Sequence, residues 1–289
     1  MIDIELEGLF RAAGIGVAGN FAGHLEQAGE AADFANIAAT ANAPKGIFPW
    51  YRPGDDGRLG AFPISGTRLI EPASATPVNL QIEPEIGVLF RVRYAPDGAV
   101  DGLTPMIAAA FNDCSIRRPG ATKISEKKNW GPASKGLAPR GFAVGDLEPD
   151  GALATLRIAS YLRRDGVAHA YGIDSPAAAY SYSGRTLIAW MLDRLRHQTG
   201  ASDTPLEPVG SYLAADGRPD VAVVGIGATR YTEFGERHFL TLGDQSIVVV
   251  YDAARLSAED LAAAVAEGSE ADLQNASVLS QTVVSPEVD

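Results

Sequence analysis

The sequence predicts an α+β protein that is mostly β, with a helical segment at its C-terminal end. The chain has 289 residues, of which 46% are hydrophobic, so it can bury a large core. Its 31 glycines and 18 prolines are spread along the chain, which suits short strands joined by turns better than a helical bundle. Several segments also alternate between apolar and polar residues, the period of a strand with one buried face.

The strands are predicted from these alternating segments and from short runs rich in valine and isoleucine. In one such segment, alternate residues from Ile86 to Val92 share a face, and Asp97-Gly98 marks a turn beyond it. Asp165-Gly166 joins two others as a hairpin. The predicted strands cover residues 86–94, 153–164, 167–171, 221–226 and 246–251.

The predicted helices lie in the last third of the chain. Residues 185–197 place five apolar side chains on one helical stripe. A further helix is predicted to begin with Ser257 as its N-cap and to end at Gly268, and a second short helix is predicted at 271–279. We therefore predict a body at 1–252, made of an N-terminal or lid part (1–64) and a β-rich core (65–252), followed by a helical extension at 253–289.

Charge and cysteine content exclude several classes of protein. The net charge is -12 with a pI near 4.8, and we expect no nucleic-acid partner for such an acidic chain. Cys114 is the only cysteine, which excludes an internal disulfide framework and a cysteine zinc site. The N-terminal residues do not resemble a signal peptide, and no apolar run approaches the ~18 residues that span a membrane. We expect a cytoplasmic protein with no membrane partner.

The segment from Gly14 to Gly19 matches the G-x-G-x-x-G pattern of dinucleotide-binding proteins. Such a site needs a buried strand before the glycines and a helix after them. The residues on either side favour neither element, so we predict a turn here. A nucleotide-dependent oxidoreductase remains only a remote alternative.

Two acidic segments favour a cation site. In Glu83-Pro84-Glu85, an extended backbone points both carboxylates to one side, where their repulsion needs a compensating cation or proton. Asp113 follows an apolar run and could supply a third carboxylate. The plainer alternatives are a solvated edge for the glutamates and a local salt bridge between Asp113 and Arg117.

Basic residues follow these carboxylates. Lys135 lies among small and apolar residues, where burial could lower its pKa, although an ordinary surface lysine is the plainer alternative. The segment 119–128 is more basic than its surroundings, which would help to attract an anionic substrate, and a solvated loop is the alternative.

Taken together, five motifs in this order resemble the fumarylacetoacetate hydrolase family. They are Gly19-Asn-Phe-Ala-Gly-His24, Ser65-Gly-Thr-Arg-Leu-Ile-Glu-Pro72, the two glutamates, Asn112-Asp113-x-Ser115-x-Arg117, and Trp130 with Lys135 and Pro139-Arg-Gly141. The resemblance covers roughly residues 14–250. It implies a mixed β-sandwich or β-roll body, a homodimer, and a small anionic substrate.

The resemblance also implies a metal and a reaction. Glu83, Glu85 and Asp113 would bind one divalent cation, and an all-carboxylate set favours Mg²⁺, with Mn²⁺ or Ca²⁺ as alternatives, over zinc. The family's chemistry is cleavage or decarboxylation of a 2-oxo acid or 1,3-dicarbonyl compound, with C–C hydrolysis through a metal-stabilised enolate. His24 would be the base and Lys135 would stabilise an oxyanion. Arg117, Tyr51 and Thr229 would contact the substrate.

One departure from the family pattern concerns the partner of His24. Family hydrolases place a glutamate three residues after the histidine, and this chain has Gln27 there. Either Glu26 or Glu30 substitutes for that glutamate, or the chemistry needs a weaker base. We therefore predict catalytic roles for His24, Lys135, Glu26 and Gln27. A non-catalytic member of the fold, or an isomerase or hydratase, is the alternative to a hydrolase or lyase.

Overall fold

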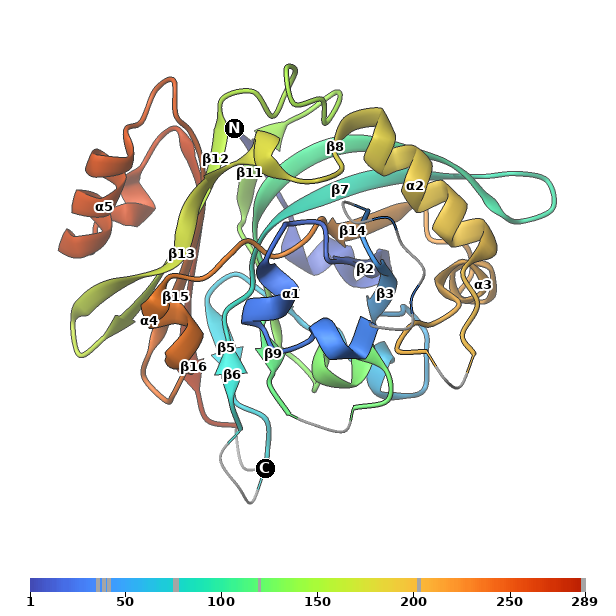
Figure 1. Cartoon of the computed structure of the whole chain (residues 1–289), viewed down its shortest axis with the longest axis horizontal. Helices are drawn as coiled ribbons and strands as arrows, with labels where there is room; N and C mark the ends of the chain where they lie inside the picture. Colours follow the sequence, from blue (N-terminus) through green and yellow to red (C-terminus); the bar gives the residue numbers. More distant parts are fainter. Residues whose placement is uncertain are drawn as a thin grey trace.

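The structure is a computed structural model, which describes residues 1–34, 37, 40, 43–74, 78–118, 121–201 and 204–286. Two large sheets make up most of it. Helix α5 (Ala258–Glu267) lies outside one sheet and helix α2 (Gly184–His197) outside the other, whereas helix α1 (His24–Gln27) lies at the centre of the view (Figure 1). The predicted fold class, α+β and mostly β, is confirmed. None of the described helices is long and apolar enough to cross a membrane.

The first sheet contains nine strands within the described residues. Its main path is β1-β11-β8-β7-β14-β2-β3, with β10 paired to β8 and β4 paired to β10. The predicted strands at 86–94 and 221–226 lie in it as β7 and β14. The strands are β1 (Ile2–Asp3), β2 (Ala13–Ala18), β3 (Gly46–Tyr51), β4 (Ile64–Ser65), β7 (Pro84–Tyr94), β8 (Val100–Asn112), β10 (Lys135–Leu137), β11 (Arg140–Ala143) and β14 (Val221–Gly225).

The glycine-rich segment is a strand, so the turn predicted there is wrong. Strand β2 runs parallel to β14 and antiparallel to β3. A Cβ atom would lie 2.3 Å from the ring of Trp50 at Gly14, and 2.1 Å from the ring of Phe48 at Gly16. The glycines therefore make room for two aromatic rings of β3, and only Gly19, with φ of 73°, forms a turn. The strand-to-helix turn of a dinucleotide site is not formed by these residues.

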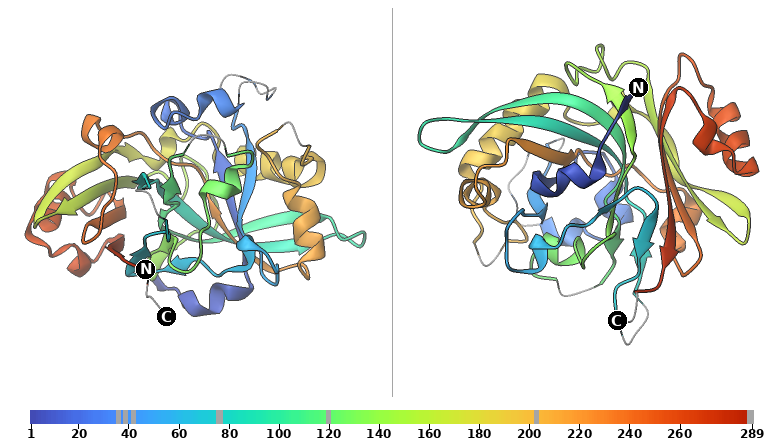
Figure 2. Two further views of the ribbon diagram at one scale, coloured as in Figure 1. Left: turned by 90° about the horizontal axis from the view of Figure 1, so that it is seen from below. Right: turned by 180° about the vertical axis from the view of Figure 1, so that it is seen from behind.

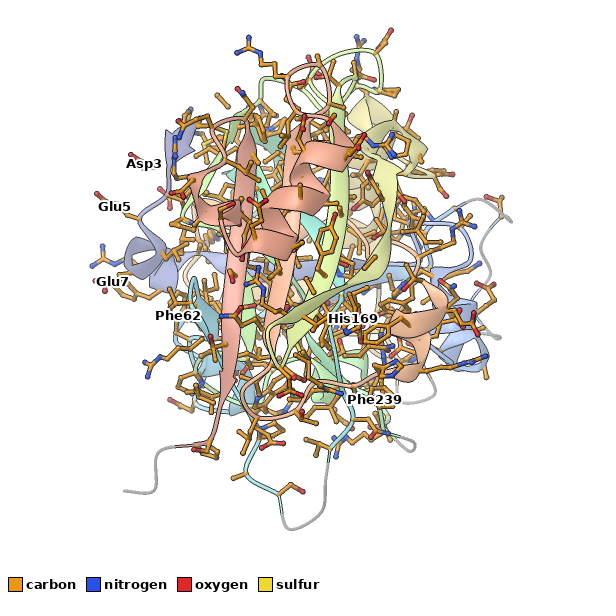
Figure 3. The ribbon with its side chains drawn as sticks, turned by 90° about the vertical axis from the view of Figure 1, so that its left-hand side faces the viewer. Asp3, Glu5, Glu7, Phe62, His169 and Phe239 are labelled. Atoms are coloured by element: carbon orange, nitrogen blue, oxygen red, sulfur yellow. The ribbon has the colours of Figure 1, made fainter. Side chains whose placement is uncertain are left out.

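The second sheet has the order β13-β12-β15-β16-β5, and a short pair, β6-β9, lies apart from both sheets. The predicted hairpin is confirmed: Asp165 (φ 51°) and Gly166 (φ 79°) join β12 to β13. Helix α5 lies across the outer face of this sheet (Figure 3). The strands are β5 (Arg68–Ile70), β6 (Leu80–Gln81), β9 (Ser115–Ile116), β12 (Leu156–Arg164), β13 (Val167–Pro176), β15 (Gln245–Asp252) and β16 (Ala276–Val284).

Two of the predicted helices are present. Helix α2 buries Leu187, Met191 and Leu195, and in α5 Ser257 caps the N–H of Asp260. Figure 2 shows α2 and α3 on the opposite side of the molecule from α5. The α-helices are α1 (His24–Gln27), α2 (Gly184–His197), α3 (Val209–Ala215), α4 (Glu233–Arg237) and α5 (Ala258–Glu267). The 3₁₀ helices are Leu6–Arg11, Ala31–Phe34, Arg58–Gly60, Ile124–Lys127, Ala177–Ala179 and Glu270–Asp272.

The second short helix predicted at 271–279 is wrong, because residues Ala276–Val284 form β16 between β15 and β5. The buried face of β16 contains the polar residues Ser277 and Gln281 beside Leu279 and Val283. The sequence therefore lacks the regular alternation of apolar and polar residues that would predict a strand. These polar side chains bind the first sheet: the Ser277 hydroxyl accepts from Ala110 N–H at 2.9 Å, and Gln281 Oε1 accepts from the Asn112 amide at 3.1 Å. Residues 287–289 of the predicted extension lie outside the described residues.

Candidate metal centre

Four strands bring the candidate residues to one end of the first sheet. Strands β2 and β14 are parallel, β7 runs antiparallel to β14, and β8 runs antiparallel to β7. The ends of β2, β14 and β8 therefore meet the beginning of β7. Glu83 and Glu85 flank the start of β7, Asp113 follows β8, and His24 follows β2.

The three predicted ligands form a buried cluster. Glu83, Glu85 and Asp113 are 3%, 2% and 0% exposed, and one carboxylate oxygen from each lies within 4.8 Å of the others. Hydrogen bonds tie their backbones together, from Asp113 N–H to Glu83 O at 3.0 Å and from Glu83 N–H to Asn112 Oδ1 at 3.1 Å. Burial rules out the solvated edge proposed as the plainer alternative.

Cations surround two of these carboxylates. Lys128 Nζ lies 2.7 Å from Glu83 Oε2 and 2.7 Å from Asp113 Oδ2. Lys135 Nζ lies 3.1 Å from Asp113 Oδ1, and Arg117 Nη2 lies 2.7 Å from Glu83 Oε1. Asp113 thus pairs with two lysines rather than with Arg117. Lys135 is fully buried in β10, which excludes the surface lysine.

The charges shift the pKa values of the cluster in opposite directions. Burial raises the pKa of Glu85, and the neighbouring carboxylates of Asp113 and Glu83 raise it further, to well above its usual value. Burial also opposes ionisation of Glu83, but Lys128 and Arg117 outweigh it and hold the Glu83 pKa well below its usual value. Burial lowers the pKa of Lys135 even though Asp113 opposes that change. Burial and neighbouring carboxylates thus act together on Glu85, whereas cations reverse the effect of burial at Glu83.

His24 lies at the same cavity and is 4% exposed. Its Nδ1 is 2.9 Å from the carbonyl oxygen of Thr229, which can only accept, so Nδ1 carries the proton. Burial lowers the His24 pKa, which favours the neutral ring with Nε2 as a proton acceptor. Thr229 is held in turn by a 3.1 Å hydrogen bond from its N–H to Pro84 O.

The residues after His24 do not orient its ring. Among the described residues, neither Glu26 nor Gln27 bonds to the imidazole. Glu26 is exposed, and Gln27 instead accepts from Tyr231 N–H at 2.9 Å and donates to Tyr231 O at 3.2 Å. Glu30 is buried and pairs with Arg117 at 2.6 Å and with Lys127 at 2.7 Å. Their catalytic roles stay predictions.

The two remaining candidates have different surroundings. Arg117 is placed at the cluster, where it also donates to Gln81 Oε1 at 2.6 Å and to the Tyr231 hydroxyl at 3.0 Å. Tyr51 donates its hydroxyl to Phe10 O at 2.6 Å and lines a separate surface groove. Tyr51 is therefore not brought to the acidic cluster.

Sequence reasoning missed Lys128 as a member of the site. It belongs to the basic segment 119–128, of which 119–120 lie outside the described residues, and that segment was open to interpretation as a solvated loop. Lys128 is instead 2% exposed. The one signal for it was the density of basic residues in an otherwise acidic chain.

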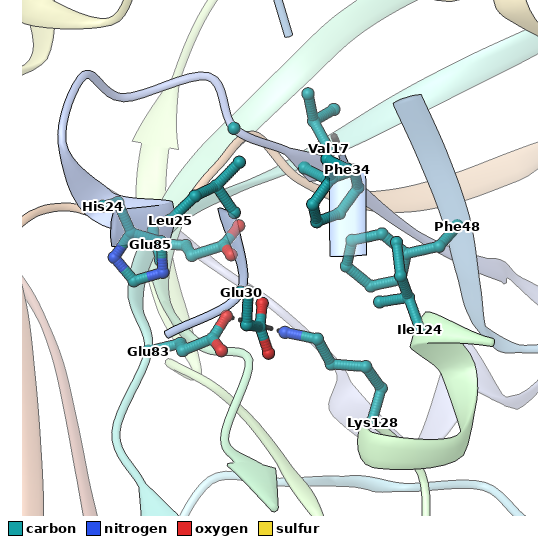
Figure 4. Close-up of a pocket in the computed structure, with 13 residues that line it drawn as sticks. Val17, His24, Leu25, Glu30, Phe34, Phe48, Glu83, Glu85, Ile124 and Lys128 are labelled. Atoms are coloured by element: carbon teal, nitrogen blue, oxygen red, sulfur yellow. Dashed lines mark hydrogen bonds and ion pairs between the residues drawn. The ribbon is translucent and has the colours of Figure 1, made fainter. Parts of the chain in front are cut away.

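Figure 4 shows the cavity with two kinds of wall. His24, Glu30, Glu83, Glu85 and Lys128 form the polar side, and the other side is apolar, formed by Val17, Phe34, Phe48 and Ile124. The free space is about 20 Å³, enough for about one water molecule. A substrate can enter only if side chains move.

The donor set fits a hard divalent cation. Its ligands are carboxylate oxygens alone, and separations up to 4.8 Å match two oxygens on opposite sides of an ion, about 4.2 Å apart for Mg²⁺ and about 4.6–5.2 Å for Ca²⁺. Among the described residues, Glu83 Oε1 and both Asp113 oxygens are buried and contact the cationic groups of Arg117, Lys128 and Lys135 rather than well-aligned neutral donors. A metal ion at these oxygens would replace part of that positive charge.

The fold and this cluster together define a mostly β protein with a buried acidic centre that could hold a metal ion. The chain belongs to a family of unknown function, DUF5718, whose family model matches residues 30–283. A search of curated proteins gives no match.

Solved structures share the fold at low sequence identity. Cg1458 with an inhibitor is 14% identical, with a TM-score of 0.50 over 95% of this chain and 77% of that one. A 2-keto-3-deoxyarabinonate dehydratase is 13% identical, with a TM-score of 0.50 over 100% and 84%. The fumarylpyruvate hydrolase of Pseudomonas aeruginosa, with Mn²⁺ and pyruvate, is 14% identical, with a TM-score of 0.47 over 95% and 90%. The likeness to the first two supports the predicted family resemblance at the level of the fold.

Proposed function

We propose that this protein is an enzyme that uses one divalent cation, with Mg²⁺ as the first candidate, to cleave or decarboxylate a small 2-oxo acid or 1,3-dicarbonyl compound. The observation that carries the proposal is the convergence of three buried carboxylates: Glu83 and Glu85 line a cavity with His24, and an Asp113 oxygen lies within 4.8 Å of an oxygen of each. When bound, the cation supplies Lewis-acid polarisation of the substrate's carbonyl oxygens.

His24 is the proposed general base. Because Thr229 O fixes the proton on Nδ1, the neutral ring presents Nε2 as the acceptor of a proton from water. The backbone carbonyl orients the ring without adding a negative charge, unlike a carboxylate partner. This arrangement supports proton transfer but stabilises the imidazolium less than a charged partner does.

Arg117 and Lys135 are the proposed positive groups for an anionic substrate. The ammonium of Lys135 is held by Asp113 Oδ1 and by the carbonyl oxygen of Cys114. Arg117 is fixed by Glu30 and Glu83. Both side chains are therefore preorganised and would favour negative charge that develops at the cavity.

Dehydration of a 2-oxo acid is the second candidate reaction. Two observations favour it: the fold is shared with a 2-keto-3-deoxyarabinonate dehydratase, and Gln27 is committed to Tyr231 instead of assisting His24. A dehydratase needs a base and a polarised carbonyl but no attacking water.

The test is a panel of acylpyruvates, oxaloacetate, 1,3-diketones and 2-keto-3-deoxy sugar acids, assayed with Mg²⁺ or Mn²⁺. We expect turnover of at least one compound, lost on addition of a chelator and lost in Glu83→Gln. Turnover that persists in chelator would refute the metal-dependent mechanism. Cation binding without turnover of any compound would favour the non-catalytic alternative.

A further inference from the structure

Lys128 competes for oxygens that the proposed cation also needs. Its Nζ lies 2.7 Å from Glu83 Oε2 and 2.7 Å from Asp113 Oδ2, two of the three residues in the cluster. Like a metal ion, the ammonium brings two carboxylates from different strands together. The cavity beside it has room for about one water molecule. With so little free space, an ammonium and a divalent cation would compete for Glu83 and Asp113.

The main chain of Lys128 is fixed separately from its side chain, which has several rotatable bonds. The residue caps the 3₁₀ helix Ile124–Lys127, and its N–H donates to Ser125 O at 3.1 Å. Its side chain lines the cavity, with Nζ 5.1 Å from the centre of the Phe48 ring (Figure 4). Rotation about the stem can withdraw the ammonium without refolding the main chain.

The charge count of the region leads to the same conclusion. Among the described residues, the buried acids and bases of the cluster are equal in number: Glu30, Glu83, Glu85 and Asp113 face Arg117, Lys127, Lys128 and Lys135. A divalent cation would add two positive charges to a group in which the acids do not outnumber the bases. Withdrawal of one ammonium from the carboxylates would offset part of that added positive charge.

We propose that Lys128 is a built-in competitor of the divalent cation: its ammonium holds Glu83 and Asp113 together in the metal-free protein and leaves them when the ion binds. This inference rests on the cation site of the proposed function. Lys128 therefore keeps the ligands assembled before metal arrives, and it weakens metal binding by the free energy of its two ion pairs.

The test compares Mn²⁺ binding, without substrate, to full-length wild type, Lys128→Met and Lys127→Met, by titration calorimetry and electron paramagnetic resonance. Methionine keeps much of the lysine stem and removes the charge. We expect Lys128→Met to bind Mn²⁺ at least about tenfold more tightly than wild type. Lys127→Met is the matched control, since Lys127 pairs with Glu30, and its affinity should change by less than about threefold.

The outcomes separate this inference from the proposed function. If wild type binds Mn²⁺ and Lys128→Met binds it no more tightly, the competitor role is wrong while the cation site stands. If neither protein binds Mn²⁺ at millimolar concentration, the cation site and the competitor role both fail.

A second measurement uses the wild-type protein, in case Lys128→Met does not fold. Side-chain ¹⁵N NMR follows the ammonium signals of the buried lysines during a Mg²⁺ titration. We expect the Lys128 signal to shift or vanish as Mg²⁺ saturates the protein. Lys123, whose Nζ donates to three backbone carbonyls, should be unchanged. A Lys128 signal that persists unshifted at saturation would overturn the inference.

Discussion

Two groups of buried ion pairs in this protein are built differently. Beside the second sheet, two acids are each matched to one arginine of β12 that bonds both of their oxygens. Arg163 donates to Glu270 at 3.0 and 2.7 Å, and Arg164 donates to Asp244 at 2.8 and 2.6 Å. Two parallel hydrogen bonds leave these carboxylates little capacity for another ligand.

In the first sheet, the carboxylates are close together and share their cations. Asp113 and Glu83 both contact Lys128, and no described Lys or Arg is within ion-pair distance of Glu85, whose Oε2 accepts from Gly227 N–H at 2.9 Å. Oxygens without aligned donors are costly in a structural role, but a binding site needs them. The contrast separates pairs that hold the fold from a cluster that can bind a ligand.

The largest expected effect is on Mn²⁺ affinity when Asp113 is replaced, and it tests whether the two groups of ion pairs differ in function. Asp113→Asn should weaken Mn²⁺ binding by at least about a hundredfold, because an amide supplies one neutral oxygen where a carboxylate supplied charge. Glu270→Gln, an equally conservative change in the 3₁₀ helix beside the second sheet, should alter Mn²⁺ affinity by less than about twofold. Titration calorimetry measures both, and equal losses would show that the two groups do not differ in function.

A smaller effect is expected on protein stability when Asp244 is replaced or is protonated at low pH. Burial alone would raise the Asp244 pKa, but hydrogen bonds from Arg164 and from Thr241 N–H hold it below its ordinary value of 3.8. A depressed pKa gives stability that is present above the unfolded-state value and is lost as the pH falls through the folded-state value. Asp244→Asn should therefore cost about 1–2 kcal/mol of unfolding free energy at pH 7. In urea titrations, that difference from wild type should shrink below about pH 4.

The smallest expected effect is on the unfolding free energy when Glu85 is replaced. Glu85→Gln removes a carboxylate that repels Glu83 and Asp113, so the metal-free protein should gain about 0.5–1 kcal/mol of unfolding free energy at pH 7. The same variant should bind Mn²⁺ more weakly. Urea denaturation with and without Mn²⁺ gives both quantities, and a destabilised metal-free variant would contradict the repulsion.

Local patterns were sufficient for part of this fold. Strand β7, the β12–β13 hairpin and helices α2 and α5 were predictable because their apolar periods, turn residues and caps lie within each segment. The convergence of Glu83 and Glu85 follows from two alternate positions in an extended segment. Their approach to Asp113 depends on the pairing of β7 with β8. The position of Asp113 after an apolar run suggested it as a third carboxylate, and the resemblance to a known family placed the three residues in one site.

The missed features depend on contacts between distant segments. Strand β2 contains glycines because Trp50 and Phe48 of β3 occupy the space that its side chains would take. Strand β16 has polar residues on its buried face because they bond to the other sheet. Burial of Lys128 is tolerated only because Glu83 and Asp113 meet it, which no pattern within 119–128 reveals.

The polar face of β16 has a consequence for the centre in the other sheet. Gln281 Oε1 accepts from the amide of Asn112 at 3.1 Å, and Asn112 Oδ1 in turn accepts from the N–H of Glu83. A side chain of the second sheet thus supports, through one amide of the first, the backbone beside the first carboxylate of the centre. The packing of the two sheets and the placement of that carboxylate are therefore linked by a single relay of hydrogen bonds.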